Sequence, residues 1–567
     1  MFNKNDLFDV EIVDITSEGE GVGKKDGFTF FIKDTIIGDI ITMRVTKLKK
    51  NYGYGRLEKI ITASPDRVEP LCPLARSCGG CQIQEMSYES QLKFKQNKVY
   101  NNLLRLGGFD KTLLDSVMEP IIGAVDESGD YTFGYRNKAQ FPFGLNKEGE
   151  AVCGFYAGRT HSIISNTDCR LGVSENKDIL ETILSWMKKY NIKPYDEVTC
   201  KGYIRHALIR KGFRTGQIMI CLVVNDDKLP KSKELVESLL VLNDSLEATY
   251  GSRIKSISLS VNKEKTNVIM GNSYEVLWGE PVIEDIMNVG GKSLKFKISP
   301  LSFYQVNPIQ VEKLYGTAIE FASLTGCEEV WDLCCGIGTI TLAMANNASM
   351  VHGIEIVPQA IEDAKKNAVA NGISNAEFIC APAEDYLPKH AATIKADVIV
   401  MDPPRKGMDE EALKVVVGAA PSKIVYVSCD SATLARDLKY LCSQGYELKR
   451  VRPCDMFCNT VHVETVVLLS QLRQKPDDYI DVDIDVAELE GTSAETKATY
   501  EKIKKYVAEH NDGMKVSSLY IAQVKKKCGI ELAENFNLPK SEDSRQPQCP
   551  KEKEEAIMKA LKSFKMI

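Results

Sequence analysis

The residue best suited to covalent chemistry is Cys429, which stands in the run Tyr-Val-Ser-Cys-Asp at residues 426–430. An apolar, strand-like stretch precedes it, and residues 431–438 have the composition of a good helix. A thiol at such a junction lies beside a helix N-terminus, where the helix dipole favours the thiolate. The alternative is an inert, buried apolar cysteine. The motifs upstream of Cys429 favour the reactive interpretation, because they predict a ligand site on neighbouring strands.

The first of these motifs is a glycine turn after an acidic strand end. Residues 329–345 read as strand, turn and helix, with Asp332 closing the strand and a Gly-x-Gly turn beginning at Gly336. Glycines permit a tight turn and a close approach of the backbone to a ligand. The third glycine of a dinucleotide fingerprint would fall at Thr341 and is absent, which disfavours NAD. An acid before Gly-x-Gly is typical of a site for S-adenosylmethionine (SAM).

Two further strands end in carboxylates. Residues 351–355 end in Glu355, an acid placed to hydrogen-bond ribose hydroxyls. Residues 396–401 lead into Asp402 and two prolines, which hold the following loop rigid. Gly-x-Gly alone is weak evidence. The Gly-x-Gly turn, Glu355 and Asp-Pro-Pro follow one another in order, one in each βα unit, and together they strongly favour a doubly wound α/β domain. The alternative is a nucleotide-binding domain of another kind. DNA and N6-amino methylases usually place an aromatic residue after Asp-Pro-Pro, where this chain has Arg405.

Short alternating strands with glycine turns fill residues 1–62 and predict a small β-barrel. The predicted strands are Leu7–Ile15, residues 18–23, Phe28–Lys33, Asp39–Leu48 and Gly53–Ile61. Between residues 44 and 59 the basic residues are Arg44, Lys47, Lys49, Lys50, Arg56 and Lys59, with Glu58 as the one acid. Tyr52 and Tyr54 stand among them. Cations for phosphates and rings for base stacking predict binding of single-stranded RNA; the alternative is a solvated charged hairpin.

A cysteine cluster follows the barrel, with Cys72, Cys78 and Cys81 in the spacing C-x5-C-x2-C. The Gly-Gly pair before Cys81 lets the backbone wrap closely around a ligand. Three cysteines within ten residues predict metal or cluster ligation. Zinc and an iron–sulfur cluster both satisfy this local chemistry. The spacing is not the C-x3-C-x2-C of radical-SAM enzymes.

The composition sets the class of protein. A chain of 567 residues suggests three or four domains, and 44% hydrophobic with 26% charged residues is ordinary for a soluble globular protein. No apolar run approaches the ~18–20 residues that span a bilayer. Seventeen cysteines without a secretory pattern predict a reducing cytoplasm, with thiols free for ligation or catalysis. The net charge of −6 does not indicate a nucleic-acid binder, so local patches must carry that argument.

Five motifs stand in a fixed order along the second half of the chain. They are Phe-Tyr-Gln-Val-Asn-Pro at residues 303–308, Asp-Leu-Cys-Cys-Gly-Ile-Gly at 332–338, Asp-Pro-Pro-Arg-Lys-Gly at 402–407, Ser-Cys-Asp at 428–430 and Val-His-Val-Glu at 461–464. With these motifs the chain closely resembles the RNA uracil-C5 methyltransferases of the RumA/TrmA type, over roughly residues 8–470. The barrel, which resembles a TRAM domain, and the cysteine cluster match the ribosomal-RNA branch of that family.

The resemblance implies a cofactor and a set of site residues. It implies a [4Fe–4S] cluster on Cys72, Cys78, Cys81 and Cys169, and SAM contacts from Gln305, Cys334, Glu355 and Asp402 beside the turn at Gly336. It implies Cys429 as nucleophile and Glu464 as base. Two positions depart from the family pattern: Cys334 replaces an aromatic residue that packs near the cofactor, and Cys458 replaces a common proline.

The implied chemistry explains why these residue types are needed. Uracil C5 is a poor nucleophile until a thiolate adds at C6, which splits one difficult step into easier ones. Glu464 suits removal of the C5 proton if burial raises its pKa toward the working pH. The target base must leave its stack to reach the pocket, so base flipping or an unpaired loop is expected.

The remaining segments are less informative. Residues of about 120–290 look like mixed α/β, with a strand pair formed by Ile204–Arg210 and Gln217–Val224. The runs at residues 135–138 and 202–206 suit either RNA phosphate contacts or surface hairpins. Beyond residue 472, the acidic stretch Asp477–Glu490 suits an edge strand or a linker, and residues 494–509 and 517–527 read as helices. The second helix has three interpretations: a partner in a helix-turn-helix, a basic surface that binds RNA, or part of a small accessory bundle.

The sequence thus predicts an α/β protein with four domains: a TRAM-like, OB-like barrel at 1–62, a mixed α/β central domain at 63–298, a doubly wound SAM-dependent methyltransferase domain at 299–472 and an extension of unassigned role at 473–567. The predicted function is methylation of uridine C5 in ribosomal RNA of the 23S type, by a cytoplasmic monomer. One alternative keeps the chemistry and takes transfer RNA as substrate. Another is an RNA-binding scaffold with an inactive methylase domain.

Overall fold

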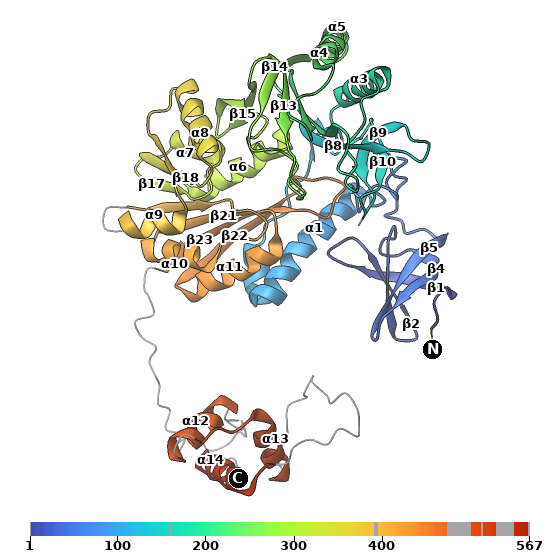
Figure 1. Cartoon of the computed structure of the whole chain (residues 1–567). Helices are drawn as coiled ribbons and strands as arrows, with labels where there is room; N and C mark the ends of the chain where they lie inside the picture. Colours follow the sequence, from blue (N-terminus) through green and yellow to red (C-terminus); the bar gives the residue numbers. More distant parts are fainter. Residues whose placement is uncertain are drawn as a thin grey trace. The chain divides into compact units, whose positions relative to one another are not determined.

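In a computed structural model of the chain, the described residues are 2–158, 160–390, 395–472, 500–511, 514–528 and 549–564. The chain divides into two compact units, Met1–Asp477 and Asp478–Ile567. The first unit contains a barrel, a central α/β part and a doubly wound sheet, in chain order (Figure 1). The stretch Asp477–Glu490, predicted as an edge strand or a linker, lies outside the described residues.

A closed five-stranded barrel forms the N-terminal part, with strand order β1-β2-β3-β5-β4. Its strands are β1 (Leu7–Ile15), β2 (Gly21–Lys25), β3 (Phe28–Ile32), β4 (Ile40–Leu48) and β5 (Tyr52–Thr62). Alternate side chains point inward, so Ile12, Phe30 and Met43 fill the interior. A Cβ at Gly53 would lie 2.7 Å from the Phe30 ring, so glycine lets β5 pass closely over this core. The predicted barrel is confirmed.

Helix α1 links the barrel to the rest of the unit. It spans Tyr88–Asn102 and continues as a π-helical turn, Leu103–Gly107, before α2 (Lys111–Val117). Val99 and Leu103 are fully buried in the core beneath the doubly wound sheet. Two short strands follow, β6 (Val125–Asp126) and β7 (Gly129–Asp130).

The central part is a seven-stranded sheet in the order β10-β9-β8-β11-β12-β13-β14. Its strands are β8 (Lys138–Leu145), β9 (Ala151–Tyr156), β10 (Ile163–Ser165), β11 (Ile204–Lys211), β12 (Gln217–Val224), β13 (Arg253–Val261) and β14 (Glu275–Gly279). The predicted pair, β11 with β12, is antiparallel. Helices α3 (Glu175–Tyr190), α4 (Ser232–Leu240) and α5 (Asn243–Tyr250) accompany this sheet. Their apolar side chains share one core with β8, β11, β12 and β13.

The doubly wound sheet has the order β19-β18-β17-β20-β21-β23-β22. Its strands are β17 (Glu329–Asp332), β18 (Met350–Glu355), β19 (Ala376–Cys380), β20 (Val398–Met401), β21 (Lys423–Ser428), β22 (Tyr446–Cys454) and β23 (Glu464–Gln471). The first five pair in parallel, whereas β23 runs antiparallel between β21 and β22. A separate hairpin, β15 (Ile283–Val289) with β16 (Lys292–Ile298), precedes the sheet.

Helices cover both faces of this sheet (Figure 1). They are α6 (Pro308–Ala322), α7 (Thr339–Ala345), α8 (Pro358–Ala370), α9 (Ala383–His390), α10 (Glu410–Ala419) and α11 (Ser431–Ser443). Along β21, Val425 and Val427 belong to the core shared with α6 to α8, and Ile424 and Tyr426 to the core shared with α9 to α11. This period-two division on an apolar strand is what a sheet buried on both faces requires. The predicted doubly wound α/β class is confirmed.

The second unit contains three described helices, α12 (Tyr500–His510), α13 (Ser518–Lys527) and α14 (Lys551–Ser563). Ile503, Val507, Ile521 and Ile557 are buried among them. The helices expected at residues 494–509 and 517–527 correspond to α12 and α13 where the structure describes those residues. Throughout the described part of the chain, no helix combines the length and apolar character that crossing a membrane needs.

Candidate active site

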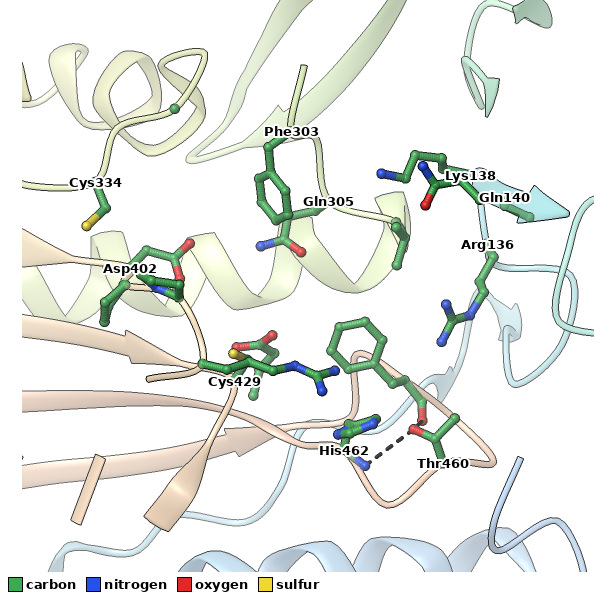
Figure 2. Close-up of a pocket in the computed structure, with 18 of the residues that line it drawn as sticks. Arg136, Lys138, Gln140, Phe303, Gln305, Cys334, Asp402, Cys429, Thr460 and His462 are labelled. Atoms are coloured by element: carbon green, nitrogen blue, oxygen red, sulfur yellow. Dashed lines mark hydrogen bonds between the residues drawn. The ribbon is translucent and has the colours of Figure 1, made fainter. Parts of the chain in front are cut away.

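A cavity of about 1050 Å³ is lined by residues of both the central part and the doubly wound sheet. Every predicted site residue lines it: Cys72, Cys78, Cys81, Cys169, Gln305, Cys334, Gly336, Glu355, Asp402, Cys429 and Glu464. In Figure 2, Arg136, Lys138 and Gln140 lie on one side of the cavity and Cys334 and Asp402 on the other. Residues that stand up to 392 positions apart in the sequence therefore meet at one site.

The glycine turn after β17 shapes one end of the cavity. Gly336 and Gly338 have φ values of +54° and +86°, a backbone conformation that a side chain would strain. Asp332 is fully buried and accepts hydrogen bonds from the Thr341 hydroxyl at 2.6 Å and from the backbone N–H of Cys334 at 3.4 Å. Burial raises the pKa of Asp332 to about 6 in spite of these bonds. Asp332 thus stabilises the glycine turn from its buried side.

Glu355 ends β18 beside the same turn. Its carboxylate accepts from the backbone N–H of Gly336 at 3.2 Å and from that of Val357 at 3.0 Å. These bonds fix the carboxylate at the carboxyl edge of the sheet, the edge where ligands bind in this class of fold. Its position suits the predicted contact with ribose hydroxyls.

Gln305 and Phe303 enter the cavity from the segment before α6. Asn307 caps that helix by accepting from the backbone N–H of Gln310, and Pro308 opens it. The backbone carbonyl of Gln305 accepts from the Asn137 side chain at 3.0 Å, and its amide donates to the Tyr315 hydroxyl at 3.4 Å. In contrast, the Phe303 side chain is 66% exposed although it lines the cavity (Figure 2). An exposed ring over an open site is available for stacking.

Cys429 follows the last residue of β21 and precedes α11, as predicted. Burial and the nearby carboxylates of Glu464 and Asp402 raise the pKa of its thiol to about 12, against the opposing charge of Arg405. Burial and these carboxylates therefore oppose the helix N-terminus, which was expected to favour a thiolate at Cys429. The Asp430 carboxylate takes the helix N-terminus instead, by accepting from the backbone N–H groups of Ala432 and Thr433.

Two carboxyl groups face the thiol. Glu464, the first residue of β23, is 3% exposed, and burial together with the charge of Asp402 raises its pKa well above the usual value. Burial and the nearby Asp332 raise the pKa of Asp402 to about 7. Asp402 is therefore poised to exchange protons near neutral pH, and Glu464 is a stronger base than an ordinary carboxylate.

The loop between β22 and β23 is held firmly, although Cys458 replaces the proline that the resemblance leads us to expect. Asp455 at its start pairs with Lys95 of α1, and both side chains are completely buried. Tyr88 donates to the same carboxylate at 3.0 Å, and Tyr135 donates to the Cys458 carbonyl at 3.1 Å. Hydrogen bonds thus supply rigidity that a proline would otherwise give.

Sequence reasoning did not single out several residues that line the cavity. Gln140 and His206 come from β8 and β11, and Phe457, Thr460 and His462 come from the loop before β23. Thr460 and His462 are linked by a hydrogen bond of 3.3 Å (Figure 2). His206 belongs to the run at residues 202–206 and His462 to the motif at 461–464, although neither histidine was assigned a role in the site. Gln140, Phe457 and Thr460 carry no local signal, because their proximity depends on packing between distant segments.

Arg136 and Lys138 give the central side of the cavity a positive character. Both line it, and burial together with the charges of Arg210 and Arg136 lowers the pKa of Lys138 to about 8. The opposite end carries Asp332, Glu355 and Asp402. One end of the cavity therefore suits a cationic ligand and the other an anionic one.

The four predicted cluster ligands converge. Burial and the neighbouring thiols of Cys169, Cys78 and Cys72 raise the pKa of Cys81 to about 12. Cys78 pairs with Ala157 in an isolated bridge, and the backbone N–H of Gly79 donates to the Tyr156 carbonyl. Across the described ranges of the chain, however, no group of three or more His, Cys, Asp or Glu side chains is arranged to hold a metal ion.

The barrel carries a second candidate surface. The rings of Phe31, Tyr52 and Tyr54 lie 5.5–5.9 Å from one another on its outer side. Exposed Lys47, Lys49 and Lys50 stand nearby in the chain. Of the six basic residues counted in the sequence, Arg44 and Arg56 both pair with Glu58, at 2.8 and 2.7 Å, which leaves the lysines as the main source of positive charge.

Comparison with known proteins matches two family models to the chain. Residues 231–472 match the tRNA (uracil-5-)-methyltransferase model, and residues 3–57 match the TRAM domain. Proteins named as RNA methyltransferases, from Clostridium tetani and Halalkalibacterium halodurans, are each 44% identical to the chain. The first alignment covers 83% of this chain and 98% of its relative, and the second covers 82% and 97%.

A solved structure is also similar. It is the tRNA (uracil-54, C5)-methyltransferase of Pyrococcus abyssi in complex with S-adenosyl-L-homocysteine. The TM-score is 0.63 and the sequence identity 25%, over 81% of this chain and 99% of that one.

Proposed function

Because the chain belongs to the RNA uracil-C5 methyltransferase family and carries a TRAM domain, we propose that it methylates C5 of a uridine in ribosomal RNA of the 23S type, with SAM as donor. The observation that carries this proposal is the convergence of Cys429, Asp402 and Glu464 with the glycine turn in one cavity. An RNA-binding scaffold with an inactive methylase domain would not require these residues to lie together.

SAM occupies the acidic end of the cavity in this proposal. The turn at Gly336 and Gly338 admits the donor close to the backbone, and Glu355 hydrogen-bonds the ribose hydroxyls. Gln305, Cys334 and Asp402 line the same end. The sulfonium is a cation, so the surrounding carboxylates stabilise it. Cys334 leaves more room beside the donor than the aromatic residue that the family pattern has at this position.

Cys429 supplies the nucleophile. Its thiolate adds to C6 of the uracil, and the ring electrons move to O4, which gives C5 the character of a carbanion. C5 then attacks the methyl group of SAM, and S-adenosyl-L-homocysteine leaves as a neutral thioether. Since burial and the neighbouring carboxylates raise the pKa of the thiol in the free protein, the thiol must lose its proton to solvent when the substrates bind. The positive charge of SAM near Asp402 and Glu464 favours that loss.

Glu464 acts as the base that ends the reaction. Its carboxylate takes the proton from C5, the C5–C6 double bond re-forms, and the C6–S bond breaks to release the Cys429 thiolate. Burial suits this role, because it raises the pKa of Glu464 and makes the carboxylate a stronger base than one in water. Asp402 stands close enough to influence the charge of both groups.

The RNA reaches the cavity from its positive side. Arg136 and Lys138 are placed to contact phosphates, and exposed Phe303 to stack on a base. The flipped uridine then lies between these residues and Cys429. The rings and lysines of the barrel bind a neighbouring single-stranded segment.

The four converging cysteines are proposed to hold a [4Fe–4S] cluster. Cys72, Cys78, Cys81 and Cys169 line the same cavity and neighbour one another, and four thiolates are the donor set that such a cluster takes. The cluster would supply a rigid anchor for the segment around it.

The choice of ribosomal RNA rests on the cysteine cluster and the barrel, which resemble the ribosomal branch of the family. Transfer RNA is the second candidate, because the similar solved enzyme from Pyrococcus abyssi is described as acting on tRNA. The proposed enzyme acts in the cytoplasm as a monomer.

The test is covalent trapping. The protein is mixed with SAM and ribosomal RNA fragments that contain 5-fluorouridine, digested, and searched for adducts by mass spectrometry. A methylated fluorouracil on Cys429 is expected, because the base cannot remove fluorine from C5. An adduct with transfer RNA alone would move the substrate to the second candidate, and no adduct with any RNA, despite bound SAM, would refute the uracil chemistry.

A further inference from the structure

The segment after the cysteine cluster touches the loop that leads to Glu464. The backbone N–H groups of Gln82 and Ile83 both donate to the carbonyl oxygen of Asn459, over 3.2 and 3.4 Å. Gln82 directly follows Cys81, and Asn459 lies five residues before Glu464. The predicted cluster site and the predicted base are therefore joined by a short path that runs along the backbone of both segments and across these two hydrogen bonds.

The Gln82 side chain strengthens this link. Its amide donates to the carbonyl of Gly79, between Cys78 and Cys81, at 2.9 Å, and its carbonyl oxygen accepts from the backbone N–H of Val461 at 3.4 Å. One side chain thus reaches into the cysteine segment on one side and into the catalytic loop on the other.

Asn459 uses all of its polar groups in this junction. Its backbone N–H donates to the side chain of Gln91 at 2.9 Å, its side-chain oxygen accepts from the same glutamine at 3.1 Å, and its side-chain amide donates to the Thr132 carbonyl at 3.0 Å. Its φ is +67°, in the left-handed region that asparagine tolerates better than most residues. The residue is 3% exposed. A buried and fully bonded turn of this kind has a single favourable geometry.

Apolar packing holds the same contact together. Ile83 and Val461 are buried in one small cluster with Ile36 and Met86. A Cβ at Gly19 would lie 3.0 Å from Val461, so the barrel also packs closely against this point. Movement of the cysteine segment cannot leave the catalytic loop undisturbed in such a junction.

We propose that Gln82 and Asn459 are positioning residues that couple the four-cysteine segment to Glu464, so that the group bound by the cysteines sets the position of the base. The inference rests on the proposed function. It assigns the cysteine-bound group an effect on one step of the reaction: loss of that group displaces the loop and slows removal of the C5 proton.

This step has a readout of its own. Glu464 acts after the thiol has bonded to C6 and after methyl transfer, so a displaced base leaves methylated RNA covalently attached to Cys429. A general loss of folding would instead lower adduct formation and turnover together. Accumulation of the adduct with ordinary uridine therefore separates a positioning role from a merely structural one.

The variants are Gln82→Ala and Asn459→Gly in the full chain. Glycine accepts the left-handed backbone but removes both side-chain bonds. Turnover is expected to fall about ten- to hundredfold, as for an angstrom-scale misplacement of a catalytic group. The covalent fraction, seen as RNA retained on the protein in denaturing gels, is expected to rise. The Michaelis constant for SAM is expected to stay unchanged.

Gln96→Ala is the matched control. Gln96 lies on the same helix as Gln91 and also makes two side-chain bonds to backbone, donating to Glu119 at 3.0 Å and accepting from Ile121 at 2.7 Å, but it does not touch Asn459. It is expected to turn over like the wild type. Equal effects in this control and in Gln82→Ala would overturn the proposal, as would variants whose adduct and turnover decline in parallel.

A second measurement addresses the cysteine segment. Cys81→Ser is expected to give the same accumulated adduct and faster amide hydrogen exchange in peptides over residues 455–463, with SAM binding retained. Unchanged exchange there would overturn the coupling. Glu464→Gln serves as the reference for the proposed function. If this variant accumulates no adduct and 5-fluorouridine RNA does not trap Cys429, the proposed chemistry is wrong. If both experiments give the adduct but Gln82→Ala turns over normally, only the coupling is refuted.

Discussion

The protonation of Cys429 gives the sharpest prediction from this structure. A pKa of about 12 leaves roughly one thiol in 10,000 as thiolate at pH 8, whereas an ordinary cysteine with a pKa of about 8.5 is about one quarter thiolate there. The free protein should therefore alkylate at Cys429 about two-thousandfold more slowly than at an unhindered cysteine of ordinary pKa.

The assay is alkylation with iodoacetamide between pH 7 and 10, followed by mass spectrometry. Exposed Cys327 and Cys380 serve as references within the same molecule. Because poor access also slows alkylation, the informative quantity is the slope: the rate at Cys429 should still rise about tenfold for each pH unit at pH 10, where an ordinary thiol levels off.

Removing a neighbouring negative charge should raise the rate of alkylation at Cys429. Glu464→Gln and Asp402→Asn each remove a carboxylate that raises the thiol pKa, so both should speed alkylation. SAM should speed it as well, whereas S-adenosyl-L-homocysteine, which fills the same site without the sulfonium charge, should not. A Cys429 rate that levels off near pH 8 or 9 in the free protein would refute the reasoning.

Further predictions concern the donor site, the RNA side and the cluster. Asp402→Asn should stabilise the SAM-free protein at pH 8 by roughly 4 kcal/mol, because a folded-state pKa of about 7 makes the wild type lose stability as pH rises from about 4 to 7; equal melting temperatures at pH 5 and 8 for both proteins would contradict this. Gly338→Ala should weaken SAM binding in calorimetry, since φ is +86° and a Cβ would lie 3.1 Å from Phe378, whereas Gly316→Ala, in α6 with open space around it, should not. Lys138→Gln should lower the slope of log affinity for RNA against log salt by about 0.7, the value for one phosphate contact on a single strand, and an unchanged slope would remove Lys138 from the RNA path. Anaerobically purified protein should be brown with about four irons per chain, and colourless protein with one zinc would exclude the cluster.

Local sequence was sufficient for the elements and for the chemistry at their ends. The period-two pattern of the first 62 residues predicted a barrel, and the strand ends at Asp332, Glu355, Asp402 and Cys429 predicted a ligand edge, because parallel strands in a doubly wound sheet present their carboxyl ends together. The structure has both features.

The tertiary structure decided what no local pattern contains. Only packing brings Glu464 beside Cys429, because β23 inserts antiparallel next to β21, and only packing sets their proton affinities, since burial and mutual charge outweigh the helix N-terminus that Asp430 already occupies. The contact between Gln82 and Asn459, which lie 377 positions apart, likewise has no local sequence signal in either segment. Local sequence determines which backbone geometry is favourable. Electrostatic interactions between side chains, and contacts between distant segments, depend on distances that only the folded chain defines.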